Sequence, residues 1–300
     1  MKPKANTREI KECPVCGKND FSLFLNTKDY FLTQEEFTID KCLNCGFVFT
    51  NPIPIESELF KYYDSPDYLS HTASKASVTG QIYKMFRNAN IRNKYKLVSS
   101  YTKGKTILDI GCGTGELLNF FKQKGWDAQG VEPNPSARSF ASKSYNIDVF
   151  DEDELDKFNE NSFDVISMWH VLEHVPDLDG RMKQLNKLVK KDGLILIALP
   201  NLNSPDAVKY GQHWAGLDVP RHLYHFTKGT LQVLLKRHKM ELIDSIPMKF
   251  DAYYVSLLSE KYLKHSLPFI PAFANGLRSN LKARSDNNYS SMIFVIRPSK

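Results

Sequence analysis

The sequence lacks any apolar run that reaches the roughly 18 residues a membrane-spanning helix needs. Its first residues, MKPKAN, also lack the apolar core that a secretory signal peptide carries. We therefore expect a cytoplasmic protein. With 300 residues and 42% hydrophobic content, the chain is long enough to bury one substantial core and to carry a small accessory domain.

Positive charge is not massed anywhere along the chain. The formal net charge of +6 is mild for this length, and the basic residues are spread rather than clustered. The composition permits nucleic acid as a partner but does not demand it.

Cysteine is scarce, but four of the five cysteines stand in pairs. Cys13 and Cys16 form one C-x-x-C-G turn and Cys42 and Cys45 form another, with 25 residues between the pairs. Four thiolates on two such turns make a tetrahedral zinc shell. We predict a zinc ribbon over residues 8–54, in which the closed shell leaves no open position and the zinc is structural. A disulfide pair and a redox C-x-x-C motif are the alternatives.

The stretch TILDIGCGTG, residues 106–115, predicts a strand, a glycine loop and the start of a helix. Its first half is a short apolar run with β-branched residues, which is typical of a buried parallel strand. Glycines at alternate positions remove Cβ atoms where the backbone turns sharply, and they let a ligand approach closely. The amides that open the next helix then point at that ligand.

A second strand is expected over residues 126–131, and an acidic residue, Glu132, stands at its end. It follows Gly115 by 17 residues. A carboxylate at this place can accept hydrogen bonds from both hydroxyls of a ribose. The third glycine of the dinucleotide fingerprint is missing at its usual spacing, which disfavours a pyrophosphate-binding site.

Together these residues carry a resemblance to a known family. Residues 108–115, with Glu132 and the later run SFDVI at 162–166, resemble class I S-adenosylmethionine-dependent methyltransferases, in particular the ubiquinone-type and sugar methyltransferases. The resemblance covers residues 94–245 and the final strand. It implies an α/β, Rossmann-like, seven-stranded sheet over residues 102–300, with the last strand antiparallel. A non-catalytic Rossmann-like domain is the alternative.

The resemblance also implies a set of donor-binding residues at the carboxyl ends of the first four strands. They are Asp109, Gly111, Gly113, Glu132, Asp151 and Trp169. In the family, an acidic side chain after the third strand holds the adenine, and Asp151 or Asp153 can fill this part. Four acids in a row, residues 151–154, are also typical of a solvated loop.

The fourth strand, residues 163–168, ends in the richest chemical cluster of the chain, WHVLEHV. Ligands of open α/β sheets lie outside such ends. In a helical turn, His170, Glu173 and His174 share one face, which suits a proton acceptor or a divalent ion. Ubiquinone-type O-methyltransferases have a similar V-L-E-H-V stretch with a cation. This chain has histidine where that family commonly has an acid, and plain structural histidines are the alternative.

A loop at residues 214–226, WAGLDVPRHLYHF, mixes aromatic, acidic and basic residues more densely than a connection needs. Similar bacterial methyltransferases carry the same P-R-H-L-Y-H-F run. We expect it to form the substrate-side wall of the cleft, with Arg221, His222 or His225 facing an anionic or hydroxylated acceptor. A loop held together by its own hydrogen bonds is the alternative.

Two further segments complete the organisation. Residues 55–101 are expected to form a lid or packing strap, aromatic-rich over 56–77, followed by an amphipathic helix. Residues 250–288 are an insertion whose apolar faces and basic flanks suit peripheral membrane contact through 250–284, a dimer contact or a helical cap. The final strand is expected at residues 291–296, at the edge of the sheet.

The sequence thus predicts an enzyme that moves a methyl group from S-adenosylmethionine to a small-molecule or sugar-like acceptor. Such a transfer is an in-line displacement, so the protein holds donor and acceptor in line and accepts a proton. His174, with His170 or His222, is the predicted base, because histidine accepts protons near neutral pH. An RNA or protein acceptor recognised by the zinc ribbon, and a non-catalytic donor-binding module, are the alternatives.

Overall fold

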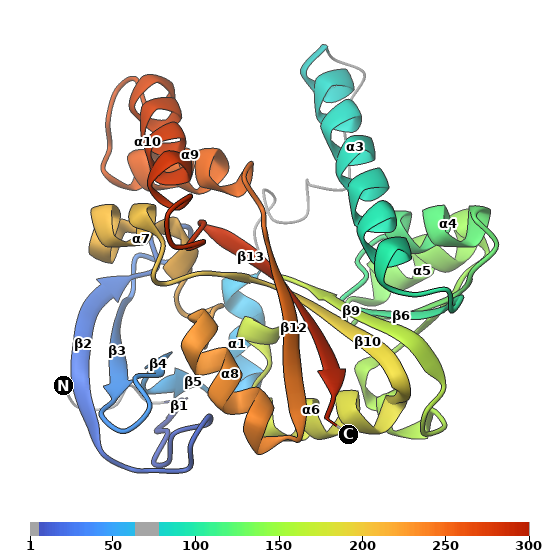
Figure 1. The fold of residues 1–300 in the computed structure, drawn as a ribbon. Coiled ribbons are helices and arrows are strands. Elements are labelled where there is room, and N and C mark those ends of the chain that lie inside the picture. Colours follow the sequence, from blue (N-terminus) through green and yellow to red (C-terminus); the bar gives the residue numbers. More distant parts are fainter. Residues whose placement is uncertain (1–5, 64–77, 300) are drawn as a thin grey trace. The chain divides into compact units, whose positions relative to one another are not determined.

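The computed structural model describes residues 6–63 and 78–299 (Figure 1). The chain divides into two compact units. Unit 1 comprises Met1–Ser65, Leu172–Asp179 and Ala198–Phe294, and unit 2 comprises Pro66–Val171, Gly180–Ile197 and Val295–Lys300. Most of the predicted lid lies outside the described residues. None of the described helices has the length and apolar content needed to cross a membrane.

A seven-stranded sheet has the strand order β12-β13-β10-β9-β6-β7-β8. The strands are β6 (Thr106–Ile110), β7 (Asp127–Val131), β8 (Asp148–Phe150), β9 (Phe163–Trp169), β10 (Val189–Pro200), β12 (Met240–Pro247) and β13 (Ser291–Pro298). Strand β6 pairs in parallel with both β7 and β9, and β7 pairs in parallel with β8. The last strand is antiparallel, so the predicted α/β fold is confirmed.

The position of the last strand differs from the prediction. Strand β13 lies between β12 and β10 rather than at the edge, and β12 is the edge strand. The side chains explain the order, because the first six residues of β13 are all buried whereas most of β12 is partly or fully exposed. An edge strand has one unpaired side and tolerates polar residues, so MELIDSIP suits the edge better than SMIFVIRP.

The helices that precede and connect the strands of this sheet follow from amphipathic patterns and local caps. They are α3 (Val78–Tyr101), α4 (Glu116–Gln123), α5 (Pro135–Tyr145) and α6 (Leu178–Leu188), with a 3₁₀ turn, η3, at Glu152–Lys157. Helix α4 buries Leu117, Leu118 and Phe121 on one face. Helix α5 begins at a proline, and the Asn134 side chain accepts hydrogen bonds from the backbone amides of Ser136 and Ala137.

Unit 1 contains a second sheet, of four strands in the order β11-β4-β3-β2. They are β2 (Phe21–Lys28), β3 (Glu36–Cys42), β4 (Val48–Thr50) and β11 (Tyr224–His225), and a two-stranded pair joins β1 (Thr7–Arg8) to β5 (Ile53–Pro54). Strand β11 pairs antiparallel with β4, so the 214–226 loop completes the sheet of the predicted ribbon. The sequence did not predict this pairing.

The remaining helices of unit 1 surround a mixed core. They are α1 (Glu56–Leu59), α7 (Pro205–Tyr210), α8 (Lys228–Arg237), α9 (Asp251–Tyr262) and α10 (Phe269–Lys282), with 3₁₀ turns η1 (Phe60–Tyr62), η4 (Leu172–His174), η5 (Gly211–His213) and η6 (Ala215–Leu217). Phe37 and Ile39 of β3 pack with Tyr62, Tyr210 and Trp214. The few apolar residues of the ribbon therefore share a core with the carboxyl-terminal segments, which enlarges that core.

Candidate functional site

The glycine loop between β6 and α4 has the bare backbone that the sequence predicts. Gly111, Gly113 and Gly115 have φ values of 73°, 55° and 78°, in the left-handed region that favours glycine. A Cβ atom at Gly111 would lie 2.5 Å from a methyl carbon of Val171, and one at Gly115 would lie 2.8 Å from the Cβ of Ala141. At Gly113 nothing lies within 4 Å, which leaves this glycine open to a ligand.

Glu132 follows β7 and reaches back to the glycine loop. Its carboxylate accepts hydrogen bonds from the backbone amides of Gly113 and Asn134, both at 2.9 Å. The loop and the acid that the sequence separates by 17 residues therefore lie in direct contact. A nucleoside that approaches Gly113 also meets an ionisable oxygen pair suited to its ribose.

Asp109, the acid inside β6, is buried. The Ser167 hydroxyl of β9 donates a hydrogen bond to its carboxylate, which links two paired strands. Burial raises the pKa of Asp109 to about 6, although Ser167 and Lys94 act in the opposite direction. This carboxyl therefore titrates within reach of neutral pH, and its charge is sensitive to a cation placed nearby.

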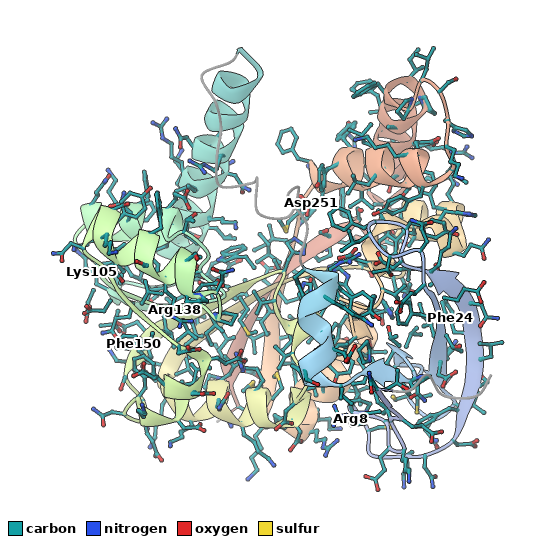
Figure 2. The ribbon with its side chains drawn as sticks, turned by 180° about the vertical axis from the view of Figure 1, so that it is seen from behind. Arg8, Phe24, Lys105, Arg138, Phe150 and Asp251 are labelled. Atoms are coloured by element: carbon teal, nitrogen blue, oxygen red, sulfur yellow. The ribbon has the colours of Figure 1, made fainter. Side chains whose placement is uncertain are left out.

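The acids after β8 have different surroundings. Asp151 accepts a hydrogen bond from the Glu152 amide and forms an ion pair with Arg138 at 2.7 Å. Arg138, labelled in Figure 2, also donates to the backbone oxygens of Glu132 and Pro133. Asp153 is exposed. Of the two candidates for the adenine, Asp151 is thus the one connected to the Glu132 turn.

Trp169 ends β9 and is partly buried. The Lys94 ammonium of α3 lies 3.9 Å from the centre of its ring, in a cation–π contact. Its indole nitrogen is buried and has no hydrogen-bond partner among the described residues. Buried donors are almost always satisfied, so this N–H indicates a place for a ligand or water.

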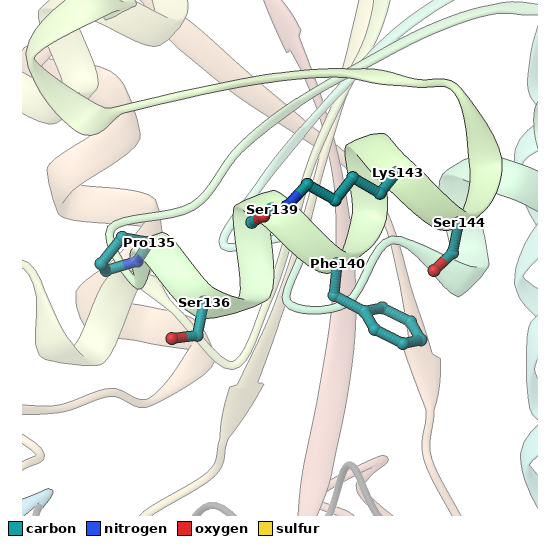
Figure 3. Close-up of a pocket in the computed structure, with 6 residues that line it drawn as sticks. All are labelled: Pro135, Ser136, Ser139, Phe140, Lys143 and Ser144. Carbon is teal, nitrogen blue, oxygen red and sulfur yellow. The ribbon is translucent and has the colours of Figure 1, made fainter.

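A hollow on the outer side of α5 does not belong to this site. Figure 3 shows that its six lining residues all come from that one helix, and Phe140 points outward from it. Neither the glycine loop nor Glu132 lines the hollow. We assign it no role in donor binding.

Cys112, whose role the sequence left open, packs inside the loop. An added Cβ at Gly130 would lie 2.6 Å from its sulfur, so the thiol fills the space that this glycine leaves. Burial and the charges of Asp109 and Glu132 raise the pKa of the thiol above its usual range. The cysteine is therefore a packing residue and a poor nucleophile.

The four paired cysteines come together in unit 1. Their sulfur atoms all lie within 4.8 Å of one another, and the pairs Cys13–Cys45 and Cys16–Cys42 are each 3.6 Å apart. A tetrahedral zinc with bonds of about 2.3 Å sets its sulfur atoms about 3.8 Å apart. The donor set and spacing thus fit zinc, and sulfurs at this separation form no disulfide.

A second group of possible ligands lies elsewhere in unit 1. One ligand atom from each of Glu173, His174 and His222 falls within 4.8 Å of the others. His170 does not belong to this group: it has a left-handed backbone, with φ of 58°, and the 3₁₀ turn begins only at Leu172. The expected helical face of His170, Glu173 and His174 is therefore wrong, and His222 takes the third place.

The hydrogen bonds of the two histidines define their tautomers. His174 Nδ1 lies 3.0 Å from the Arg221 carbonyl oxygen, and His222 Nδ1 lies 2.9 Å from that of Gly216. A carbonyl oxygen only accepts, so each Nδ1 carries the proton and each Nε2 keeps its lone pair. The ring centres are 4.6 Å apart, and the Tyr63 hydroxyl lies 3.1 Å from His174 Nδ1.

Burial sets the protonation states of His174 and His225. It lowers the pKa of His174 to about 4, with a further contribution from His222. Burial likewise lowers the pKa of His225 to about 3, and this ring lies 3.3 Å from the Thr50 hydroxyl. Both rings are neutral at pH 7. His225 lies where β11 pairs with β4, and its burial there is contrary to the expectation that it faces the acceptor.

Arg221 is not available to an acceptor, contrary to the expectation from the sequence. It is 1% exposed. Its guanidinium donates to both carboxylate oxygens of Asp218, to Asp29 at 2.8 Å and to the Tyr62 carbonyl at 2.9 Å. Burial alone would raise the pKa of Asp218, but these hydrogen bonds hold it below its usual range. Arg221 thus fixes the loop that carries His222.

Sequence reasoning missed three residues of this region. Asp29 and Tyr63 lie far along the chain from the histidines and belong to no motif. Asp218 stood inside the 214–226 loop without a stated role. The only signal for it was its spacing of three and four residues from Arg221 and His222, which suits a turn.

Comparison with known proteins identifies the class. A sequence family described as "Methyltransferase domain" matches residues 83–244, more than half of the chain. The chain belongs to this methyltransferase family.

Within the class, the chain is similar to ubiquinone biosynthesis O-methyltransferases. The protein from Erwinia tasmaniensis is 36% identical over 109 residues, which cover 34% of this chain and 44% of that one. The protein from Actinobacillus pleuropneumoniae is 29% identical over 138 residues, covering 42% and 59%. The match thus spans about half the length of these relatives.

Solved structures show the same fold at low identity. The magnesium protoporphyrin IX methyltransferase of Synechocystis, with bound SAH, has a TM-score of 0.54 at 12% identity, covering 81% of this chain and 100% of that one. Phosphoethanolamine N-methyltransferase 2 of Haemonchus contortus, in complex with S-adenosyl-L-methionine, has a TM-score of 0.52 at 15% identity, covering 93% and 69%.

Proposed function

We propose that this enzyme transfers a methyl group from S-adenosylmethionine to an oxygen of a small-molecule acceptor. The observation that carries the proposal is the contact between the Glu132 carboxylate and the open glycine Gly113. The relatives named as ubiquinone biosynthesis O-methyltransferases support an oxygen acceptor on a small molecule.

The residues that would bind the donor all belong to unit 2. The ribose hydroxyls would replace the Gly113 amide as partners of Glu132, because a carboxylate accepts two hydrogen bonds at once. Asp151 would hold the adenine from its place beside Arg138, and Trp169 would donate its indole N–H to the bound donor. Asp109 would offer a buried negative charge to the cationic end of the donor.

The proton acceptor is His174, which follows Trp169 by five residues in the chain. Bound S-adenosylmethionine would supply its methyl carbon to the acceptor oxygen, so that a C–O bond forms while the electron pair of the S–C bond stays on sulfur. The proton of the hydroxyl passes to Nε2 of His174. The His222 ring lies 4.6 Å from that of His174, and Tyr63 and the Arg221 carbonyl orient the base.

The four cysteines hold a structural zinc ion in this proposal. All four sulfurs would be ligands, so the ion has no open position for a substrate or a water. It would bind as a dication to thiolates and fix the two knuckles that bracket β2 and β3. Its contribution is stability of the ribbon sheet rather than chemistry.

We also propose a peripheral contact with an anionic membrane through α10. Toward the rest of unit 1 this helix buries only small or polar residues, which are Ala272, Asn275, Gly276 and Ser279. Its apolar residues face outward, with Phe269, Ile270 and Phe273 between 65% and 72% exposed. Arg278 and Lys282 flank this face, and α10 has no acidic residue. Such a face suits the interface of a negatively charged bilayer.

The role of His174 is tested by the variant His174→Gln in a panel of hydroxylated small molecules. We expect the rate of S-adenosylhomocysteine formation to fall roughly 100- to 10,000-fold, as for loss of a general base. The donor affinity measured by calorimetry stays the same. Wild-type activity falls only when the pH approaches 4, because protonation of His174 removes the base.

His265→Gln is the matched control, since its side chain is 54% exposed. An unchanged rate for His174→Gln would remove this residue from the chemistry. Activity that EDTA abolishes while the cysteine-bound zinc is retained would instead assign Glu173, His174 and His222 to a divalent cation.

A further inference from the structure

A cavity of about 260 Å³ in unit 1 is lined by residues from three separate segments of the chain. We call it the lysine cavity. Lys28, Tyr30 and Gln34 come from the end of β2 and the turn after it, and His213 comes from η5. Lys261, Tyr262 and Lys264 come from the end of α9 and the residues that follow it. Segments distant in sequence therefore converge on one basic hollow.

The lining is rich in positive charge and has no acid. Lys28, Lys261 and Lys264 each contribute an ammonium group to this lining. The neighbouring acid, Glu260, is buried and engaged by Tyr210, Asn275 and His265. Burial and the charge of Lys28 lower the pKa of His213, which indicates a positive local field.

Two stacked tyrosines give the cavity a fixed wall. The rings of Tyr30 and Tyr262 lie 5.2 Å apart with an angle of 18° between their planes, and His213 lies 5.1 Å from Tyr30. Lys28 stands 5.0 Å from the centre of the Tyr30 ring. Stacked rings hold their positions better than free lysines do, so the cavity has one fixed aromatic wall beside its lysines.

The two tyrosines of this wall also line a cavity beside Asp218 and Arg221, which contact the histidine pair. A second, much smaller cavity shares Lys28, Tyr30 and Tyr262 with the first and is also lined by Asp218 and Arg221. Asp218 lies 4.0 Å from Nε2 of His222. Asp218 therefore connects the surroundings of the lysine cavity to the histidine pair.

We propose that the lysine cavity binds a phosphate or diphosphate group carried by the methyl acceptor. Three lysines and a histidine exceed what a single carboxylate needs, whereas a diphosphate offers several anionic oxygens to ammonium groups and phenolic hydroxyls. The inference rests on the proposed methyl transfer and narrows its acceptor to phosphorylated small molecules.

Calorimetric titration of the full-length protein with inorganic pyrophosphate tests the cavity. We expect wild-type protein to bind, and the double variant Lys261→Glu/Lys264→Glu to bind about tenfold or more weakly, because it loses charge-assisted hydrogen bonds. Both lysines are exposed, so the variant folds. The control, Lys236→Glu on α8, lies outside the cavity and keeps the wild-type affinity. No heat at millimolar pyrophosphate would overturn the inference.

A second arm separates an acceptor phosphate from a free anion. Sugars linked to nucleoside diphosphates and the same sugars without phosphate are offered as acceptors, and S-adenosylhomocysteine is measured. Methylation of the phosphorylated set alone supports the inference, and methylation of the unphosphorylated set alone overturns it even if pyrophosphate binds. Donor affinity is measured alongside, because failure to bind S-adenosylmethionine would contradict the proposed function while leaving the anion site intact.

Discussion

At the scale of single residues, Arg221 is the most consequential side chain outside the donor site. Its guanidinium joins Asp29, in the turn after β2, to Asp218 beside His222, and it lies 4.9 Å from the ring of Phe31. Two carboxylates and a carbonyl oxygen accept the hydrogen bonds of this buried guanidinium. Loss of any one partner leaves a buried polar group without its hydrogen bond. The position of His222 is therefore coupled to the ribbon through one residue.

Arg221→Met tests this coupling. Removal of the guanidinium leaves the buried carboxylate of Asp29 and the partly buried carboxylate of Asp218 without their cation. We expect a loss of about 3–5 kcal/mol in the free energy of unfolding. Urea denaturation measures the loss. The control Arg237→Met removes an ion pair with Asp179 whose arginine is 43% exposed, and it should cost less than about 1 kcal/mol. Equal losses in the two variants would contradict the coupling.

At the scale of elements, α10 reverses the usual pattern of a surface helix. Asn275 donates to the Tyr210 hydroxyl and to Glu260, and the Ser279 hydroxyl donates to Asp206. Polar groups therefore hold α10 to unit 1 while its large apolar side chains remain exposed. A surface of this kind has a binding role more often than a structural one.

The triple variant Phe269→Ser/Ile270→Ser/Phe273→Ser tests the membrane contact. We expect cosedimentation with vesicles that contain phosphatidylglycerol to be lost, while stability is unchanged because these side chains are exposed. Leu43→Ser, on a side chain 58% exposed in the ribbon, is the control. Concentration-dependent dimers that the triple variant abolishes, with no vesicle binding by the wild type, would assign α10 to a second copy of the chain instead.

Local elements were predictable because their signals are local. The C-x-x-C-G turns, the glycine loop and the apolar runs of β6 and β9 each carry their pattern within about a dozen residues. Pairings over long separations left no such signal. Strand β11 joins β4 across some 175 residues, and Arg221 meets Asp29 across 192. The left-handed His170 was missed for another reason, since a helical spacing does not reveal a single residue with positive φ.

At the scale of the whole molecule, the proposed functions divide between the two units. The glycine loop, Glu132 and Trp169 belong to unit 2, whereas the cysteines, His174, His222 and the lysine cavity belong to unit 1. The ribbon sheet includes β11 from the loop that carries His222. The state of the metal site should therefore affect the acceptor chemistry and not donor binding.

Zinc removal tests this division. Elemental analysis should find one zinc ion per chain, and Cys42→Ser should lose it and lower the melting temperature, because the metal supplies much of the ribbon's stability. Methyl transfer should fall while the affinity for S-adenosylmethionine stays at the wild-type value. Cys112→Ser, which leaves the four-cysteine cluster intact, serves as the control. Loss of donor binding together with zinc would contradict the division.

The contact between Glu132 and the glycine loop is the basis of the whole account, and calorimetric titration with S-adenosylmethionine tests it most directly. The account predicts that the wild-type protein binds the donor. Glu132→Ala should bind it roughly 10- to 100-fold more weakly, since one or two hydrogen bonds to a charged group are lost, and its cooperative unfolding should be retained. An affinity for Glu132→Ala equal to that of the wild type would contradict the account.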